Sequence, residues 1–148
     1  MKYTTHIDID LPLAAMLALF DNAANRPEWQ PELRKMTHIS GIAGQVGAKT
    51  EMVFYIMARN SVMIETIVER NLPHSFKAIY EMKGVHNTIQ NRFEVLSEDE
   101  SRWTVESEFK FSGMMALVSG MLEGVFKRQT NDFCRNFKAF AEKNKTNL

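Results

Sequence analysis

The sequence contains a single cysteine, Cys134, no excess of either charge and no long apolar run. One thiol excludes an internal disulfide and a metal site built from several cysteines, and it is typical of a reducing compartment. The 18 basic residues balance the 18 acidic ones, so no global field attracts a polyanion, and we expect no nucleic-acid partner. No window approaches the roughly 18 apolar residues that span a bilayer, so we expect no stable membrane insertion.

Sequence motifs of common cofactor and catalytic sites are also missing. No His-x-His or His-Glu-x-x-His spacing joins the four histidines, so we expect no metal and no other cofactor. The glycines of GIAGQVG, residues 41–47, lie between two predicted strands rather than before a helix, which argues against a nucleotide-binding loop. No Gly-x-Ser-x-Gly elbow occurs. The N-terminus alternates polar with apolar residues instead of forming a signal peptide, and this predicts a cytoplasmic protein.

The length of 148 residues suits one domain, and we expect residues 1–148 to form it. Strict alternation predicts a strand at residues 3–10, and Pro12 then opens a run of strong helix formers. Two prolines around Trp29 leave room for a short second helix. Further alternating segments, separated by turn signals, complete a predicted seven-stranded antiparallel sheet. They are residues 35–40, 48–58, 62–70, 75–83, 85–96 and 102–111.

The C-terminal stretch, residues 113–148, has the periodicity of a helix. Its apolar residues recur mostly three or four positions apart, with lysines and arginines between them. These apolar residues are Leu117, Met121, Val125, Phe133, Phe137 and Phe140. A helix of about thirty residues is roughly 45 Å long, so we expect it to lie across the sheet.

This order of elements resembles the START-like, or SRPBCC, superfamily and its polyketide cyclase/dehydrase-like members. The resemblance covers essentially the whole chain and is carried by IDIDLPLAAMLALFDNAANRPEWQPEL with its Trp-x-Pro element, by GQVGAKTEM and by the long helix. It implies an α+β helix-grip fold, in which the sheet curls around the C-terminal helix and leaves a cavity between them. Binders, cyclases, transfer proteins and chaperone cofactors share this scaffold, so the resemblance does not select among them.

Several polar residues fall on strand faces that are otherwise apolar. Asn87 and Asn91 alternate with Ile89 and Phe93 on one such face, although a buried amide without a partner costs about 1–3 kcal/mol. A ligand, trapped water or a second side chain would each supply that partner. An apolar wall with a few polar groups is typical of a ligand pocket. The residues expected to line it are Tyr80, Asn87, Asn91, Ser107, Trp103, Phe109, His38 and Met121.

We predict that this pocket binds a small apolar or amphipathic molecule, such as a lipid, a polyketide-like compound or an aromatic compound. A cyclase or dehydratase would use the same pocket, with Tyr80, His38 or Glu65 moving a proton; Glu65 serves only if its strand face points inward. A protein-interaction module of the co-chaperone type would use the outer surface instead. Residues 50–58, TEMVFYIMA, are apolar on both faces, which predicts a possible homodimer.

Overall fold

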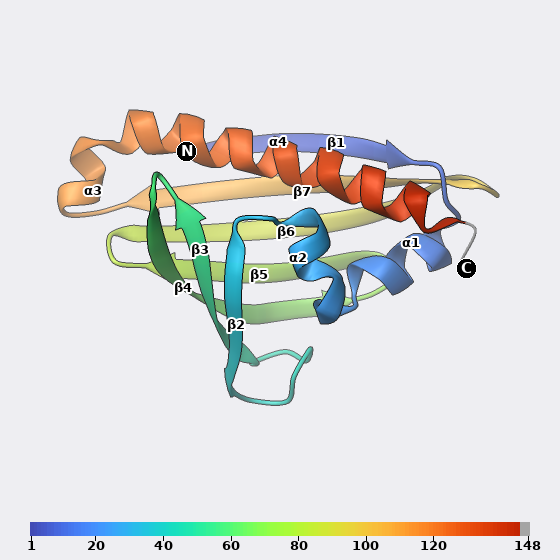
Figure 1. Ribbon diagram of the computed structural model, residues 1–148, viewed down its shortest axis with the longest axis horizontal. Coiled ribbons are helices and arrows are strands. Elements are labelled where there is room, and N and C mark those ends of the chain that lie inside the picture. The colour runs from blue at the N-terminus through green and yellow to red at the C-terminus, as the bar shows by residue number, and fades with distance from the viewer. Residues whose placement is uncertain (146–148) are drawn as a thin grey trace.

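The computed structural model describes residues 1–145 of the chain. Figure 1 labels the elements in chain order. The strands are β1 (Lys2–Ile9), β2 (Leu33–Ser40), β3 (Lys49–Ile56), β4 (Arg59–Asn71), β5 (Ser75–Met82), β6 (Val85–Ser97) and β7 (Glu100–Phe111). The helices are α1 (Leu13–Phe20), the 3₁₀ turn η1 (Ala23–Asn25), α2 (Arg26–Trp29), α3 (Met114–Leu117) and α4 (Ser119–Lys143).

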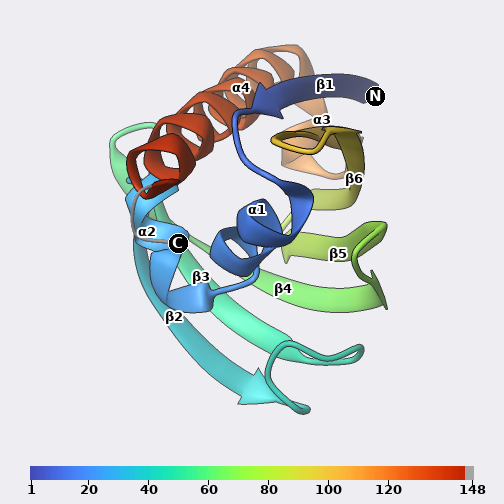
Figure 2. The ribbon, with the colours of Figure 1, turned by 90° about the vertical axis from the view of Figure 1, so that its right-hand side faces the viewer.

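All strands belong to one seven-stranded antiparallel sheet in the order β1-β7-β6-β5-β4-β3-β2. Strands β2 to β7 pair with their neighbours in the chain, and β1 pairs with β7, which places Tyr3 opposite Ser107. The sheet curls, and α4 lies along it on the same side as α1 and α2 (Figure 1 and Figure 2). The predicted α+β helix-grip fold is therefore confirmed.

Alternation decides which strand residues reach the interior. On β3, Met52, Phe54 and Ile56 are buried while the residues between them are more exposed. On β4, Met63 and Ile67 are buried on the same side as Glu65, which is only 4% exposed. The face of β4 that carries Glu65 is therefore an inner face, as the alternative enzyme reading required.

The C-terminal helix differs from the prediction in its phase. Val118 adopts φ −113° and ψ 16°, which separates α3 from α4. The buried face of α4 begins at Leu122 and Phe126, whereas Leu117 of α3 and Met121 of α4 are 79% and 54% exposed. Helix α4 ends at Lys143, and the last predicted helical residues, 146–148, lie outside the described residues.

Four aromatic side chains from four different elements meet at the centre of the core. They are Phe20 of α1, Trp29 of α2, Trp103 of β7 and Phe137 of α4, and every pair among them has ring centroids 5.1–5.7 Å apart. Most of these pairs are edge-to-face, an arrangement that adds about 0.5–1.5 kcal/mol per pair beyond the burial of apolar surface. This aromatic cluster joins both short helices and the long helix to the sheet.

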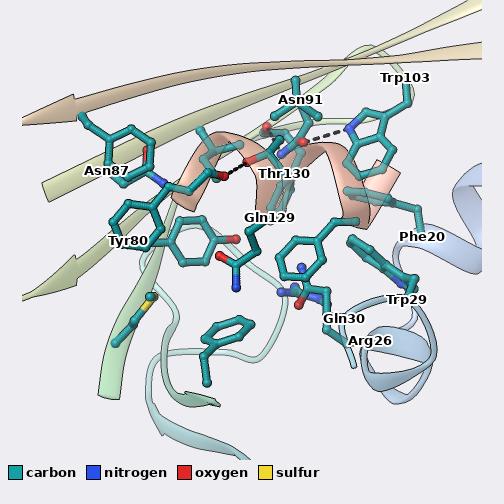
Figure 3. Close-up of a pocket in the computed structure, with 18 residues that line it drawn as sticks. Phe20, Arg26, Trp29, Gln30, Tyr80, Asn87, Asn91, Trp103, Gln129 and Thr130 are labelled. Atoms are coloured by element: carbon teal, nitrogen blue, oxygen red, sulfur yellow. Dashed lines mark hydrogen bonds between the residues drawn. The ribbon is translucent and has the colours of Figure 1, made fainter. Parts of the chain in front are cut away.

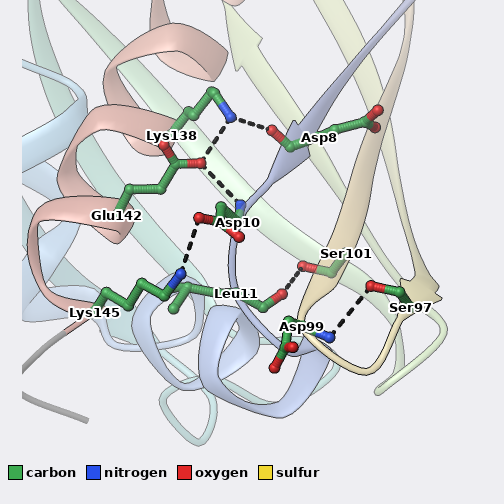
Figure 4. Close-up of polar contacts among 9 residues, drawn as sticks. All are labelled: Asp8, Asp10, Leu11, Ser97, Asp99, Ser101, Lys138, Glu142 and Lys145. Atoms are coloured by element: carbon green, nitrogen blue, oxygen red, sulfur yellow. Dashed lines mark hydrogen bonds and ion pairs between the residues drawn. The ribbon is translucent and has the colours of Figure 1, made fainter.

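Polar contacts hold the C-terminal half of α4 to the end of β1 (Figure 4). The Lys138 ammonium donates to the carbonyl of Asp8 at 2.6 Å and to the carboxylate of Glu142 at 2.7 Å. That carboxylate also accepts a hydrogen bond from the backbone N–H of Asp10 at 2.8 Å. These partly exposed contacts fix the direction of α4 more than they add stability, since exposed ion pairs contribute roughly 0–1 kcal/mol.

The outer face of β3 and β4 is unusually apolar for a solvent-facing surface. Tyr55 of β3 is 44% exposed and Val62 of β4 is 51% exposed, and Met57 in the turn between the two strands is 51% exposed. Antiparallel sheets commonly carry polar residues on such a face. The structure thus places the predicted apolar patch at the surface, and homodimerisation through it stays a prediction.

We expect Phe137→Ala to lower the free energy of unfolding by about 3–5 kcal/mol, because Phe137 is 0% exposed and its removal leaves a cavity inside the aromatic cluster. Urea denaturation followed by tryptophan fluorescence measures the change. Leu117→Ala is the matched control, and as a truncation at the surface it should change the value by no more than about 0.5 kcal/mol. A loss below about 1 kcal/mol for Phe137→Ala would show that the cluster does not organise the core.

Candidate functional site

A cavity of about 100 Å³ lies between the inner face of the sheet and α4 (Figure 3). Its wall is mostly aromatic and includes Phe20, Trp29, Phe54, Trp103, Phe109 and Phe126. The polar side chains that reach it are Arg26, Gln30, Tyr80, Asn87, Asn91, Gln129 and Thr130. This combination of an apolar wall and a few polar groups is typical of a small-molecule site.

The register of the sheet explains why the strand residues share this wall. Tyr80 of β5 lies opposite Asn87 of β6, which lies opposite Phe109 of β7. Four residues along β6, Asn91 sits in a parallel row between Phe76 and Val105. Because side chains two and four positions apart on a strand share a face, both rows point to the same side.

Asn91 has protein partners for both ends of its amide. Its oxygen accepts a hydrogen bond from the indole N–H of Trp103 at 2.9 Å, and its nitrogen donates to the carbonyl of Phe76 at 3.2 Å. The side chain is buried, and Figure 3 shows it beside Trp103 at the wall of the cavity. Asn91 therefore orients the Trp103 ring from a position that also borders the cavity.

Asn87 is satisfied at one end only. Its oxygen accepts a hydrogen bond from the hydroxyl of Ser107 at 2.9 Å. Among residues 1–145 its nitrogen has no hydrogen-bond partner, and neither does the side-chain amide of Gln129, which extends from α4 into the cavity in Figure 3. These two amides therefore have capacity to bind another molecule.

Arg26, Glu65 and Tyr80 form a buried polar triad beside the cavity. The Tyr80 hydroxyl donates to the Glu65 carboxylate at 2.7 Å, and the Arg26 guanidinium donates to the same oxygen at 3.3 Å. Burial raises the pKa of Tyr80 well above its usual value, and the negative charge of Glu65 raises it further, so Tyr80 stays protonated. Burial lowers the pKa of Arg26, but the charge of Glu65 and the interactions with Glu65 and Tyr80 together outweigh burial, and the pKa rises.

An open cleft of about 390 Å³ adjoins the cavity, between η1 and the inner face of β2, β3 and β4. Glu65 lines the cleft, Tyr80 lines the cavity, and Arg26 lines both. The triad thus stands between the two spaces.

The structure corrects the placement of three predicted pocket residues. Ser107 is 0% exposed behind Asn87 and does not line the cavity. His38 is exposed on the edge strand β2, where its Nε2 lies 2.8 Å from the Gly41 carbonyl oxygen, and it lines the cleft instead. Met121 lies on the solvent side of α4, because at about 3.6 residues per turn it is nearly opposite the buried Phe137 of the same helix. The five others line the cavity: Tyr80, Asn87, Asn91, Trp103 and Phe109.

Sequence reasoning missed several cavity residues, chiefly Arg26, Gln30, Gln129 and Thr130. Arg26 is the first residue of α2 and Gln30 follows its last residue. A helix of four residues is too short for a sequence period to indicate which of its faces is buried. Gln129 and Thr130 lie one turn beyond Phe126 on α4, so the correct helix phase would have indicated their direction.

Two searches of residues 1–145 gave negative results. No cluster of three or more histidine, cysteine or acidic side chains could hold a metal ion. Within the same range, no helix combines the length and the apolar character needed to cross a membrane.

A model of the family described as polyketide cyclase / dehydrase and lipid transport matches residues 1–142. The chain belongs to this family. The START-like resemblance proposed from the sequence is thereby confirmed. No protein of curated function matches the sequence significantly.

Solved structures of other members of this fold superpose over nearly the full chain. The Zhui aromatase/cyclase from Streptomyces sp. R1128 has a TM-score of 0.84 at 10% identity, covering 97% of this chain and 94% of its own. A START superfamily protein from Mycobacterium smegmatis has a TM-score of 0.80 at 9% identity, covering 96% and 97%. Norcoclaurine synthase from Thalictrum flavum, in complex with dopamine and hydroxybenzaldehyde, has a TM-score of 0.67 at 12% identity, covering 91% and 84%. At these identities the likeness concerns the fold.

We expect Asn91→Leu to lower the free energy of unfolding by about 1–3 kcal/mol, because it leaves the buried Trp103 N–H without its partner. Chemical denaturation measures the loss. Gln90→Leu, at the neighbouring half-buried position, is the control and should change stability by less than about 1 kcal/mol. Equal effects of the two changes would contradict a structural role for Asn91.

Proposed function

We propose that the protein binds a small apolar or amphipathic molecule with an aromatic ring in the cavity between the sheet and α4. The observation that carries the proposal is an interior space with an aromatic wall whose Asn87 and Gln129 amides have unused hydrogen-bonding capacity. Burial of the ligand's apolar surface would supply the affinity, at about 25 cal/mol per Å². Tyr80, Asn87 and Gln129 would orient its polar end.

Two further observations support a ligand of this kind. Trp29 and Gln30, which both border the cavity, have a buried indole N–H and a buried amide oxygen without hydrogen-bond partners among residues 1–145. A ligand group that both accepts and donates would relieve that cost after a small side-chain shift. In addition, the superposable norcoclaurine synthase was solved with dopamine and hydroxybenzaldehyde, which are single-ring compounds.

Filling the cavity should abolish binding of a ring-sized probe. Ile89 lines the cavity from β6, and Ile89→Phe places a ring in the space that p-cresol would occupy. We expect the affinity for p-cresol, measured by calorimetry or ligand-observed NMR, to fall at least tenfold. Thr88→Phe adds the same ring on the opposite face of β6, and it should leave the affinity within twofold of the wild type.

The proposal would fail if p-cresol and related small phenols did not bind the wild type. It would also fail if Ile89→Phe and Thr88→Phe bound p-cresol equally well. Thermal unfolding of both variants confirms that they are folded. Either result would favour a protein-interaction module that binds no small molecule.

A second candidate function is proton abstraction, and the triad geometry favours it. Tyr80 faces the cavity and donates its proton to Glu65 at 2.7 Å. When a substrate in the cavity gives a proton to the Tyr80 oxygen, the Tyr80 proton passes to Glu65. Arg26, no longer paired with a carboxylate, then faces the resulting substrate anion across the same cavity. Tyr80 would act as the general base through Glu65, and Arg26 would stabilise the anion.

Deuterium exchange tests this second candidate. We expect the wild type to speed incorporation of deuterium from D₂O at the carbon between ring and carbonyl of phenylacetone, followed by NMR. Tyr80→Phe and Glu65→Gln should each reduce the rate to that of buffer, while Thr88→Phe should not. A wild-type rate equal to buffer would rule the candidate out for ketones of this size and leave the binding function in place.

A further inference from the structure

The cleft and the cavity share part of their walls. Phe20, Arg26 and Phe76 line both spaces. The side chains of these three residues form the boundary between the two spaces. Phe20 is held in the aromatic cluster, so a rotamer change of Phe76 or Arg26 would open the partition, without breaking a strand pairing.

The volumes of the two spaces bear on the size of the ligand. An apolar cavity of roughly 150 Å³ holds benzene, so a space of about 100 Å³ has room for one ring at most, and p-cresol enters it only with an adjustment of the side chains that line it. Small-molecule sites commonly measure roughly 300–1,000 Å³. The cavity reaches that range only when it is joined to the cleft of about 390 Å³.

The charged groups of the cleft are already paired. Arg70 donates to both carboxylate oxygens of Asp21 at 2.8 and 2.6 Å, and Arg26 pairs with Glu65 at 3.3 Å. A charged ligand entering the cleft would lose hydration without gaining an unpaired counter-charge. Among the described residues, the Thr50 hydroxyl at the wall of the cleft has no hydrogen-bond partner and can bind a neutral polar group.

The remaining wall of the cleft is largely apolar. Met36, Ile67 and Leu72 contribute side chains to it. Ala23 and Ala24 of η1 also line the cleft, and their side chains are small. An apolar surface with an available hydroxyl suits an extended, mainly apolar group that carries an uncharged polar substituent.

We propose that the cleft is the second compartment of the binding site, and that the ligand is an uncharged molecule in two parts. One aromatic ring occupies the cavity, and a second, mainly apolar part with a hydroxyl or similar group occupies the cleft. The link passes between Phe20, Arg26 and Phe76. This inference rests on the proposed binding function and names the size and charge of the ligand.

The test compares a one-ring probe with a two-ring probe. The probes are p-cresol, 4,4′-dihydroxystilbene and its analogue in which one hydroxyl is replaced by a carboxylate. The wild type should bind the dihydroxystilbene at least tenfold more tightly than p-cresol and at least tenfold more tightly than the carboxylate. Thr50→Phe fills the cleft from β3 and should weaken dihydroxystilbene at least tenfold while leaving p-cresol within twofold.

Two further variants serve as a control and as a substitute for Thr50→Phe. Glu51→Phe adds the same ring on the opposite face of β3 and should change neither affinity by more than twofold. Ala24→Phe fills the cleft from η1, and it should reproduce the effect of Thr50→Phe if that variant does not fold.

The outcomes separate the two proposals. Suppose that p-cresol binds the wild type and that Ile89→Phe weakens this binding. If dihydroxystilbene then binds no more tightly than p-cresol, or if Thr50→Phe and Ala24→Phe leave its affinity unchanged, the proposed second compartment is wrong and the cavity function stands. Tighter binding of the carboxylate would overturn the uncharged class. If neither probe binds the wild type, the proposed function itself fails.

Discussion

The mutual packing of Phe20, Trp29, Trp103 and Phe137 is the constraint on which the rest of the molecule depends. Each ring comes from a different element, so the cluster sets the distance of α1, α2 and α4 from the sheet at once. Edge-to-face contacts between large rings tolerate little displacement, because the interior is close-packed. Phe20, Trp29 and Trp103 of this cluster also line the cavity, so the packing of these three rings sets one boundary of the cavity.

A buried ion pair borders this aromatic interior. Removing Glu65 and Arg26 from water is costly, and their attraction together with the Tyr80 hydrogen bond offsets that cost. The consequence is a site that contains charged groups and yet presents no unpaired charge. Such a site disfavours charged ligands, holds Tyr80 in its protonated form, and keeps a carboxylate within one hydrogen bond of the cavity.

The structural similarity to other proteins concerns the fold and not the residues that would bind a ligand or carry out a reaction. An aromatase/cyclase superposes with a TM-score of 0.84 at 10% identity. A shared fold at this level reflects shared patterns of apolar positions, since few individual residues are the same. The proposed ligand selectivity depends instead on polar side chains that face the cavity or the cleft, among them Arg26, Glu65, Tyr80, Asn87 and Gln129.

The sequence by itself determined the strands, the short helices after the first strand and the inward face of β6 with its two asparagines, because local periodicity and turn residues specify these features. Only the tertiary structure decided the break at Val118 between α3 and α4 and the meeting of Arg26 with Glu65. The last pair is separated by 39 positions in the chain. Such contacts depend on how the helices pack against a curled sheet, and no local pattern in the sequence encodes the angle at which they do so.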